Sequence, residues 1–423
     1  MSRKAHTDTA RRRYENPEMA AGSVSSASGW GLILVSLLTL WAVPTWRAAE
    51  GDALPVASLL EGWDRGRAAP NLLAANHELL AAIDRFETHL EDTSPVLEAL
   101  LPSVQSWQLR FGGKGNETVY PGAEGWLLLR AGFDHLVGPP FLDPAALERR
   151  RRGGDSWRPE PQPDPRPALF DLQRQLRERG VDLMLLPVPT KPAIEAQSVA
   201  PDIVRPLANP SQTEFVRQMD AEGIHVVDIA ATLNELTHSG TAAYLRTDSH
   251  WSPAAVSKVA ASLAARLESA YGQELGPDDA FWQATPTRRA GRGDLWRLLR
   301  LSGERALFDE ESVMADEITS WEGELWRPSR DASILVLGDS FVNVYSDESL
   351  HWGRAAGFAE QLSFHLQRPV DRLARNAGAS DQVRRDLARS PDRLDSKRVV
   401  IYLFASRELS LGDWPVVEIA AGR

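Results

Sequence analysis

Apolar runs of strand length alternate with amphipathic segments of helix length through most of the chain from residue 168 onward. The pattern predicts strands at Val181–Val188, Ile224–Ile229, 333–337, 369–374 and 398–404. It predicts helices at 168–179, 211–222, 230–238, 253–270, 354–366 and 380–390. Several of the strands are apolar at nearly every position, as parallel strands buried on both faces are. The predicted fold class is therefore α/β, a parallel sheet flanked by helices, although the stretch 271–330 has no clear pattern.

A long uncharged apolar stretch lies near the N-terminus, at Gly29–Trp46. As a helix with a rise of about 1.5 Å per residue it would span roughly 27 Å, which suffices for a bilayer core. Basic residues precede it, so the positive-inside rule places residues 1–28 in the cytoplasm and the body of the chain outside it. We therefore predict a transmembrane anchor at 29–46. The alternative is a cleaved signal peptide, with Ala48 and Ala49 near the cleavage site.

Residues 47–109 form the next segment, in which apolar positions between Leu72 and Leu90 recur at roughly helical spacing. This spacing predicts a helical leader that serves as a stalk, as a partner-binding element or as a cap on the main domain. From Val119 the pattern changes to a turn that feeds a strand ending at Leu129. We therefore predict that the catalytic domain occupies residues 110–423.

Composition removes several classes of function. The net charge of −11 and the lack of a basic stripe interleaved with aromatic residues argue against a nucleic-acid partner. The chain has no cysteine, so disulfides, thiolate metal sites and a thiol nucleophile are excluded. The sequence has no H-E-x-x-H motif and no His cluster of the kind that holds a catalytic zinc, and no nucleotide-binding glycine motif follows a strand. We therefore expect neither a metal nor a cofactor.

A candidate nucleophile follows the apolar strand Ile334–Leu337, in the turn Gly338-Asp339-Ser340. The carboxyl end of a parallel strand is where α/β folds place their ligands. Gly338 permits a tight turn, which lifts Ser340 out of the sheet edge and lets its own backbone N–H face a developing oxyanion. The alternative is an ordinary strand-to-helix turn in which the serine only caps the helix.

A candidate acid–base pair lies upstream, in the run Thr247-Asp248-Ser249-His250-Trp251-Ser252-Pro253. In an extended segment residues i and i+2 project to one side, so the carboxylate of Asp248 can reach the ring of His250. Ser252 and Pro253 start a strong helix, which makes the preceding loop rigid. With Ser340 the pair would form a Ser-His-Asp triad. The alternative is an Asp-capped turn with a packed Trp. A G-x-S-x-G elbow is missing, which disfavours a standard α/β-hydrolase.

With these residues assembled, the chain resembles the AlgJ/AlgX family, the SGNH-hydrolase-like O-acetyltransferases of bacterial exopolysaccharide modification. The stretches that carry the resemblance are Gly122–Leu129, Tyr244–Pro253, Leu337–Tyr345 and Trp352–Pro369, followed by Arg375–Gly378. As in that family, and unlike ordinary SGNH esterases, the Asp and the His precede the Ser. The resemblance implies an SGNH-like sheet, with Ser340 as nucleophile, His250 as general base and Asp248 as its orienting carboxylate.

The resemblance also implies the setting of the reaction. It implies acetyl transfer to hydroxyls of a polysaccharide acceptor in the periplasm, by a single-pass protein of the inner membrane. The acetyl donor would be a membrane-bound acyltransferase partner. Nothing in the sequence singles out alginate as the polymer. The same site could serve a carbohydrate acetylesterase, and a degenerate site would leave a non-catalytic scaffold of a polysaccharide secretion complex.

Four further residues are weaker candidates for the site. Asn376 and Gly378 follow the strand 369–374, where SGNH enzymes place a second oxyanion donor; a simple turn is the alternative. Tyr345 and Arg354 lie close enough to Ser340 in sequence to line the cleft.

Overall fold

The computed structural model describes residues 56–93, 95–153, 160–199, 207–278, 280–301 and 307–420. The chain divides into two compact units, Met1–Leu97 and Glu98–Arg423, and each is described by itself. The predicted cytoplasmic tail at 1–28 and the apolar segment at 29–46 lie outside the described residues. Among the helices that the structure does describe, none is both long enough and apolar enough to cross a bilayer.

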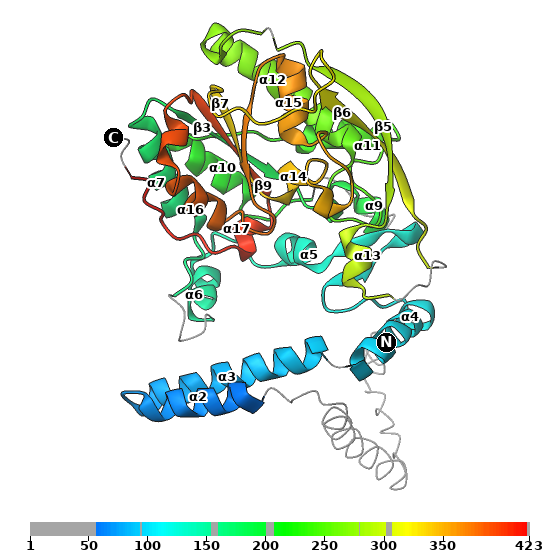
Figure 1. The fold of residues 1–423 in the computed structure, drawn as a ribbon, viewed down its shortest axis with the longest axis vertical. Coiled ribbons are helices and arrows are strands. Elements are labelled where there is room, and N and C mark those ends of the chain that lie inside the picture. The colour runs from blue at the N-terminus through cyan, green and yellow to red at the C-terminus, as the bar shows by residue number, and fades with distance from the viewer. Residues whose placement is uncertain are drawn as a thin grey trace, which may run out of the picture. The chain divides into compact units, whose positions relative to one another are not determined.

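The described part of the first unit is a helical hairpin of α2 (Val56–Ala68) and α3 (Leu72–Thr93), which lie side by side in Figure 1. A Cβ atom at Gly62 would lie 2.1 Å from Cβ of Ala82. The two helices can therefore pack this closely only because residue 62 is a glycine. The next helix, α4 (Pro95–Gly112), extends across the boundary between the units. Residues 56–112 are thus largely helical, as the sequence pattern predicts.

The second unit is built on a five-stranded parallel sheet, which confirms the predicted α/β class (Figure 1). The strand order is β4-β3-β9-β7-β8. Their bounds are β3 (Asp182–Val188), β4 (His225–Val226), β7 (Ile334–Gly338), β8 (Asp371–Ala374) and β9 (Val399–Ala405). Strand β9 lies in the middle and is buried at every residue, which explains its unbroken apolar sequence.

Successive side chains of each strand enter opposite cores. In β3, for example, Leu183 and Leu185 pack into one core, and Met184 and Leu186 pack into the other. The first core is closed by α7 (Pro165–Arg177), α10 (Gln212–Ala221) and α16 (Gln382–Ala388). The second is closed by α11 (Ala230–His238), α12 (Pro253–Tyr271) and α15 (Phe358–Leu366). The helices thus flank both faces of the sheet, as predicted.

Several predicted elements are shorter in the structure than their sequence patterns, and two of them have a clear cause. The strand predicted at 224–229 pairs only at His225–Val226, because Asp228 accepts a hydrogen bond of 2.9 Å from the Ala230 N–H and turns the chain into α11. The helix predicted at 354–366 begins at Phe358, after a turn in which Ala355 has a positive φ of 51°.

The sequence predicts no element in the stretch 271–330, but the structure has a long antiparallel hairpin there. Its strands are β5 (Gln283–Gly291) and β6 (Glu311–Thr319). Most of their side chains are at least partly exposed, and only Ala315 and Ile318 are buried in the core, so the sequence shows no clean hydrophobic alternation.

The remaining elements are short. They are β1 (Val119–Pro121), η1 (Ala123–Gly125), β2 (Leu127–Leu129), α5 (Arg130–Val137), α6 (Pro144–Arg152), α8 (Lys191–Ile194), α9 (Ala196–Val199), η2 (Gly272–Leu275), α13 (Asp294–Leu298), α14 (Ser340–Asn343), η3 (Glu348–Leu350), η4 (Pro391–Leu394) and α17 (Glu408–Leu411).

Candidate active site

Ser340 is the first residue of α14, directly after strand β7. Asp339 caps this helix, since its Oδ1 accepts the N–H of Phe341 at 2.9 Å, and its Oδ2 accepts the N–H of Ala405 in β9 at 2.9 Å. A Cβ at Gly338 would lie 2.3 Å from the carbonyl oxygen of Leu403, so this position requires glycine. The Gly-Asp-Ser turn is therefore locked to the central strand and holds Ser340 at the carboxyl edge of the sheet.

The predicted triad residues meet at this edge. Nε2 of His250 lies 2.7 Å from Oγ of Ser340, and Nδ1 lies 2.6 Å from Oδ1 of Asp248. The same Oδ1 also accepts the backbone N–H of His250 at 3.0 Å, which fixes the short loop between the two residues. Asp248 and His250 are both buried. Segments that are 90 residues apart in the chain thus supply a continuous serine–imidazole–carboxylate line.

The second oxygen of Asp248 has two donors of its own. Its Oδ2 accepts the backbone N–H of Asp294 at 2.9 Å and the indole N–H of Trp352 at 2.8 Å. Burial alone would raise the pKa of Asp248, but the facing His250 and these two donors outweigh burial and lower it. Asp248 is therefore an ionised carboxylate with fixed orientation, and it favours the protonated form of His250.

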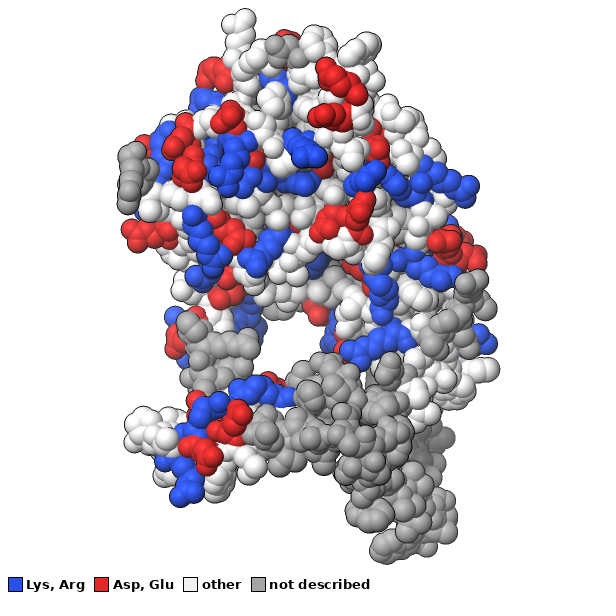
Figure 2. All heavy atoms as spheres, viewed as in Figure 1, with Lys and Arg blue, Asp and Glu red and all other residues white. Residues whose placement is uncertain are grey.

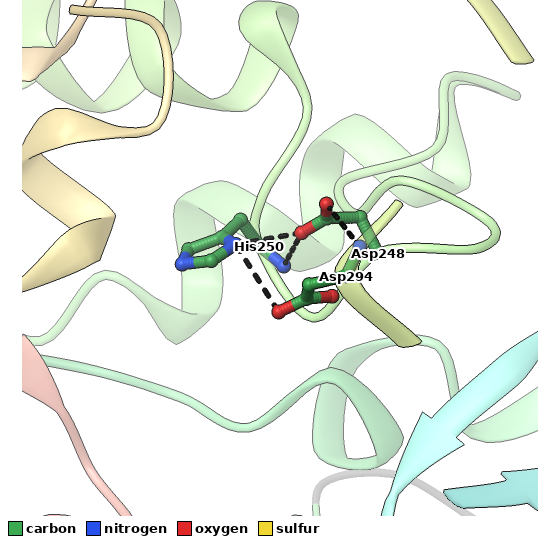
Figure 3. Close-up of side chains that lie close together, drawn as sticks. All are labelled: Asp248, His250 and Asp294. Atoms are coloured by element: carbon green, nitrogen blue, oxygen red, sulfur yellow. Dashed lines mark hydrogen bonds and ion pairs between the residues drawn. The ribbon is translucent and has the colours of Figure 1, made fainter. Parts of the chain in front are cut away.

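Asp294 is a second carboxylate beside the histidine that the sequence did not identify. It accepts the N–H and the hydroxyl of Ser249 at 2.7 and 2.6 Å, and its Oδ2 lies 3.8 Å from Nδ1 of His250 (Figure 3). Burial and the adjacent Asp248 raise the pKa of Asp294. The only signal in the sequence was the glycine-flanked run Gly291–Trp296, which reads as an irregular turn.

The pKa of His250 is raised above its ordinary value of 6.5. Burial of the ring opposes protonation, but the negative charges of Asp248 and Asp294 together outweigh it. The imidazolium that would form during proton transfer from Ser340 is thus stabilised on its Nδ1 side by two carboxylates.

Asp248, His250 and Asp294 are close enough together to suggest a metal site, because one ligand atom from each lies within 4.8 Å of the others. Their hydrogen bonds argue against this interpretation. All four carboxylate oxygens face N–H or O–H donors, and Nδ1 of His250 faces Asp248 (Figure 3). The cluster is organised to orient a histidine rather than to surround a cation.

A buried lysine anchors the loop that carries the acid–base pair. Nζ of Lys191, in α8, lies 2.6 Å from the carbonyl oxygen of Leu127, 2.8 Å from that of Arg246 and 2.9 Å from that of Asp248. Its ammonium also lies 4.9 Å from the ring centroid of Trp126. Burial lowers the pKa of Lys191 to about 7, against the attraction of Asp248 and its other acidic neighbours. Lys191 thus ties Asp248 to the β1–β2 hairpin.

Two carboxylates hold the N–H groups of the same loop. Oε1 of Glu195 accepts the N–H of Ala243 at 2.7 Å, and Glu311 of β6 accepts that of Arg246 at 2.8 Å. With Lys191 on the carbonyls, three charged side chains fix the backbone before His250, two from α8 and its C-cap and one from β6. These supports had no recognisable sequence signal, because each is a single charged residue distant in the chain from the loop.

The aromatic neighbours of the site also fix its geometry. The ring of Phe341 packs 4.8 Å from that of His250, and the indole of Trp251 donates to the carbonyl of Phe341 at 3.0 Å. Tyr345 was predicted to line the cleft, but it is fully buried and its hydroxyl donates to the carbonyl of Trp251 at 2.8 Å. Tyr345 therefore supports the histidine loop from within the core, which corrects the prediction of its location.

The other weak candidates lie apart from the triad hydrogen bonds. Arg354 is exposed and pairs with Glu348 at 3.7 Å. The amide of Asn376 accepts from Asn343, which is in the same helical turn as Ser340, at 3.1 Å, and donates to Asp347 at 3.0 Å. The carbonyl of Gly378 accepts the N–H of Val383 at the start of α16. An oxyanion role for Asn376 or Gly378 stays a prediction.

Comparison with known proteins places this site in a family. Residues 155–405, which include all three triad positions, match the family model described as the SGNH hydrolase-like domain of acetyltransferase AlgX. The chain belongs to this family. The resemblance predicted from its motifs is thereby confirmed.

The chain is also similar to individual proteins. The chain is 26% identical over 253 residues to the probable alginate O-acetylase AlgJ of Pseudomonas aeruginosa, across 59% of this chain and 58% of that protein. The match therefore spans less than two thirds of the relative. The solved O-acetyltransferase domain of Pseudomonas putida AlgJ has the same fold, with a TM-score of 0.53 and 17% identity over 70% of this chain and 93% of that one. Pseudomonas aeruginosa AlgX gives a TM-score of 0.45 with 15% identity, over 70% and 67% of the two chains.

Proposed function

We propose that this protein is an O-acetyltransferase that acetylates hydroxyl groups of an exopolysaccharide, alginate-like or other. The observation that carries the proposal is the hydrogen-bonded line from Ser340 through His250 to Asp248, at the carboxyl edge of the sheet. The domain that contains it matches the AlgX-type family. The assembled line weighs against a purely non-catalytic scaffold, because a scaffold has no need of it.

The first step forms an acetyl-enzyme. Oγ of Ser340 attacks the carbonyl carbon of the acetyl donor while Nε2 of His250 accepts the serine proton. The bond between the acetyl carbon and the donor oxygen then breaks, and His250 returns the proton to that oxygen. Asp248 keeps the ring oriented and stabilises the imidazolium formed in between. The N–H of Ser340, with a donor from the Asn376–Gly378 loop, is the proposed oxyanion site.

The second step passes the acetyl group on. A sugar hydroxyl gives its proton to Nε2 of His250 and attacks the acetyl carbon, the ester bond to Oγ of Ser340 breaks, and Ser340 takes the proton back. If water takes the place of the sugar hydroxyl, the same site is an acetylesterase. The triad geometry supports both reactions, so the acceptor decides between them.

The setting of the reaction is part of the proposal. We place the catalytic domain in the periplasm, held to the inner membrane by the apolar segment 29–46, and we propose a membrane-bound acyltransferase as the acetyl donor. The support for this setting is the charge pattern around that segment and the similarity to AlgJ.

The test is intact-protein mass spectrometry of the full chain after incubation with a small activated acetyl ester. Three proteins are compared, the wild type, Ser340→Ala, and Ser349→Ala as a matched control at an exposed serine. We expect one added acetyl group on the wild type and on the control, and none on Ser340→Ala. Faster discharge by an oligosaccharide than by water supports the transferase, and discharge by water alone supports the esterase. An adduct that persists in Ser340→Ala contradicts the mechanism.

A further inference from the structure

A second pocket lies at the carboxyl ends of three neighbouring strands, β9, β3 and β4. Ser406, Pro189 and Val227, which directly follow these strands, all line it, and none of the three triad residues does. Its volume is about 600 Å³, within the range of roughly 300–1,000 Å³ that is usual for small-molecule sites. The pocket is therefore a candidate site of its own, at the edge where α/β folds bind their ligands.

One wall of this pocket is fixed by a buried asparagine. The side-chain amide of Asn209 donates to the carbonyls of His135 and Pro139, at 2.6 and 3.3 Å. Its Oδ1 accepts the N–H groups of Phe141 and Ser211, at 3.3 and 2.9 Å. These four hydrogen bonds join the end of α5 to the loop before α10, and both segments line the pocket. The pocket is therefore preformed, as small-molecule sites usually are.

The pocket offers little charge to balance an ion. Among the described residues that line it, none is Lys or Arg, and the one carboxylate, Asp228, is exposed and already accepts the Ala230 N–H at 2.9 Å. Burial lowers the pKa of His135 to about 4, so this imidazole is neutral at pH 7. Figure 2 shows Lys and Arg interspersed with Asp and Glu on the face it displays. An ion in the pocket would lose hydration without gaining a buried partner, so the pocket favours an uncharged ligand.

The lining of the pocket is mostly aliphatic, contributed chiefly by Pro, Val, Leu and Ala side chains. Such a surface gains from covering the aliphatic body of a ligand. Neutral polar groups are interspersed with it. Nδ1 of His135 lies 2.6 Å from Oγ of Ser410, so Nε2 is the ring nitrogen that remains for a ligand.

Thr190 is the polar residue of this lining that lacks a partner. It is 4% exposed, and its Oγ1 has no hydrogen bond to any described residue. Thr190 is the N-cap of α8, but Oγ1 makes no capping bond, because the N–H of Ala193 goes to the carbonyl of Thr190 and Pro192 has no N–H. A buried hydroxyl without a partner is unfavourable, so a ligand oxygen that bonds to it gains affinity.

We propose that this pocket binds an uncharged molecule with an aliphatic body and a hydroxyl or carbonyl oxygen, which forms a hydrogen bond with Oγ1 of Thr190. The aliphatic body lies against the proline and valine side chains, and Nε2 of His135 is the second polar contact. The inference goes beyond the proposed function, because the pocket is separate from the triad. The two sites are nevertheless adjacent in the chain, since Thr190 directly precedes Lys191, whose Nζ lies 2.9 Å from the carbonyl oxygen of Asp248.

The test measures the binding of three probes that share one ring and differ in charge, cyclohexanol, cyclohexanecarboxylate and cyclohexylammonium. Calorimetry uses the full chain in lipid nanodiscs, with empty nanodiscs as the baseline. The wild type is compared with Thr190→Val, which removes the hydroxyl and keeps the shape, and with Thr190→Ser, which keeps the hydroxyl. Thr232→Val is the matched control, at a half-buried threonine of α11 that does not line the pocket.

We expect cyclohexanol to bind the wild type about tenfold or more tightly than either charged probe does. Thr190→Val should weaken the binding of cyclohexanol about three- to tenfold, as the loss of a hydrogen bond between neutral groups does. Thr190→Ser and Thr232→Val should bind cyclohexanol as the wild type does. Without a probe, the urea midpoint of Thr190→Val should not fall, because the hydroxyl that it removes has no partner among the described residues.

Three results overturn the inference. The first is tighter binding of the carboxylate or the ammonium probe than of cyclohexanol. The second is that cyclohexanol does not bind, or binds Thr190→Val as tightly as the wild type. The third is a lower urea midpoint in Thr190→Val, which would show that the hydroxyl is bonded within the protein. Neither measurement needs turnover, so a failure of the acetyl-adduct experiment would refute the proposed function and leave this test intact.

Discussion

The backbone N–H of Asp294 donates a hydrogen bond of 2.9 Å to Oδ2 of Asp248, the oxygen that does not face His250. The indole of Trp352 donates to the same oxygen at 2.8 Å. Two segments outside the loop of Asp248 thus hold the same oxygen of its carboxylate. One of these segments directly follows β5 of the hairpin that the sequence pattern did not reveal.

Replacement of Trp352 by Phe should weaken this hold. The side chain is only 1% exposed, so no water takes the place of the lost N–H, and Asp248 keeps a single donor on Oδ2. A hydrogen bond to a charged group contributes about 1.5–3 kcal/mol, so we expect kcat for ester cleavage to fall about tenfold or more. Trp282→Phe is the control, since it removes an indole bond to the carbonyl of Arg368 instead. Equal kinetics for the two variants would show that Trp352 does not act through Asp248.

Activity should be lost on acidification around a pH that is higher than the ordinary pKa of a histidine, 6.5. His250 must be neutral to accept the serine proton, and its pKa is raised above 6.5, so activity is complete above the folded-state pKa and is lost as pH falls through it. Burial and Arg407 oppose the rise, and Asp248 and Asp294 cause it. Asp294→Asn should therefore move the acid limb to lower pH. The measurement is kcat/KM for a small acetyl ester between about pH 5 and 8.

The control for this pH shift is Asp392→Asn, which removes an equal charge at a side chain that is 69% exposed. Its acid limb should coincide with that of the wild type. If the acid limb of the kcat/KM profile does not move in Asp294→Asn, the carboxylate of Asp294 binds Ser249 but does not affect the pKa of His250.

Lys191→Met should destabilise the domain and the site together. The change leaves the carbonyl oxygens of Leu127 and Asp248 without the Nζ donor, while the carbonyl of Arg246 keeps a hydrogen bond of 2.9 Å from the Leu127 N–H. Unpaired buried acceptors cost about 1–3 kcal/mol each, partly offset by relaxation, so we expect a loss of about 2–4 kcal/mol in the free energy of unfolding. Urea denaturation measures it. Lys258→Met, at a partly exposed lysine that pairs with Glu235, is the control and should change little. A loss no larger than that of the control would refute the anchoring role.

The strands and the long helices were predictable because each rests on local sequence. Strands β3, β7 and β9 are apolar runs, and α12 begins at Ser252 and Pro253, whose capping geometry is the predicted one. The meeting of Ser340 with His250 was predictable from chemistry, since a serine at the carboxyl edge of a sheet needs a base.

What the sequence did not reveal depends on contacts between distant segments. Asp294 and Lys191 look like ordinary surface charges until the fold brings them to the loop of Asp248. The β5–β6 hairpin buries few side chains, so it lacks the periodic signal of a strand. The same reasoning misplaced Tyr345, because closeness in sequence to Ser340 does not show which way a side chain points.

The position of β9 has a consequence for how the chain matures. The middle strand of the sheet is the last of the five to be synthesised, and β3 and β7 have no pairing with each other until β9 lies between them. A nascent chain that ends before Val399 therefore holds both the Asp248–His250 loop and Ser340 without the sheet that would join them. We therefore expect the hydrogen-bonded line from Ser340 to Asp248 to form only after the last strand of the sheet, Val399–Ala405, has been synthesised.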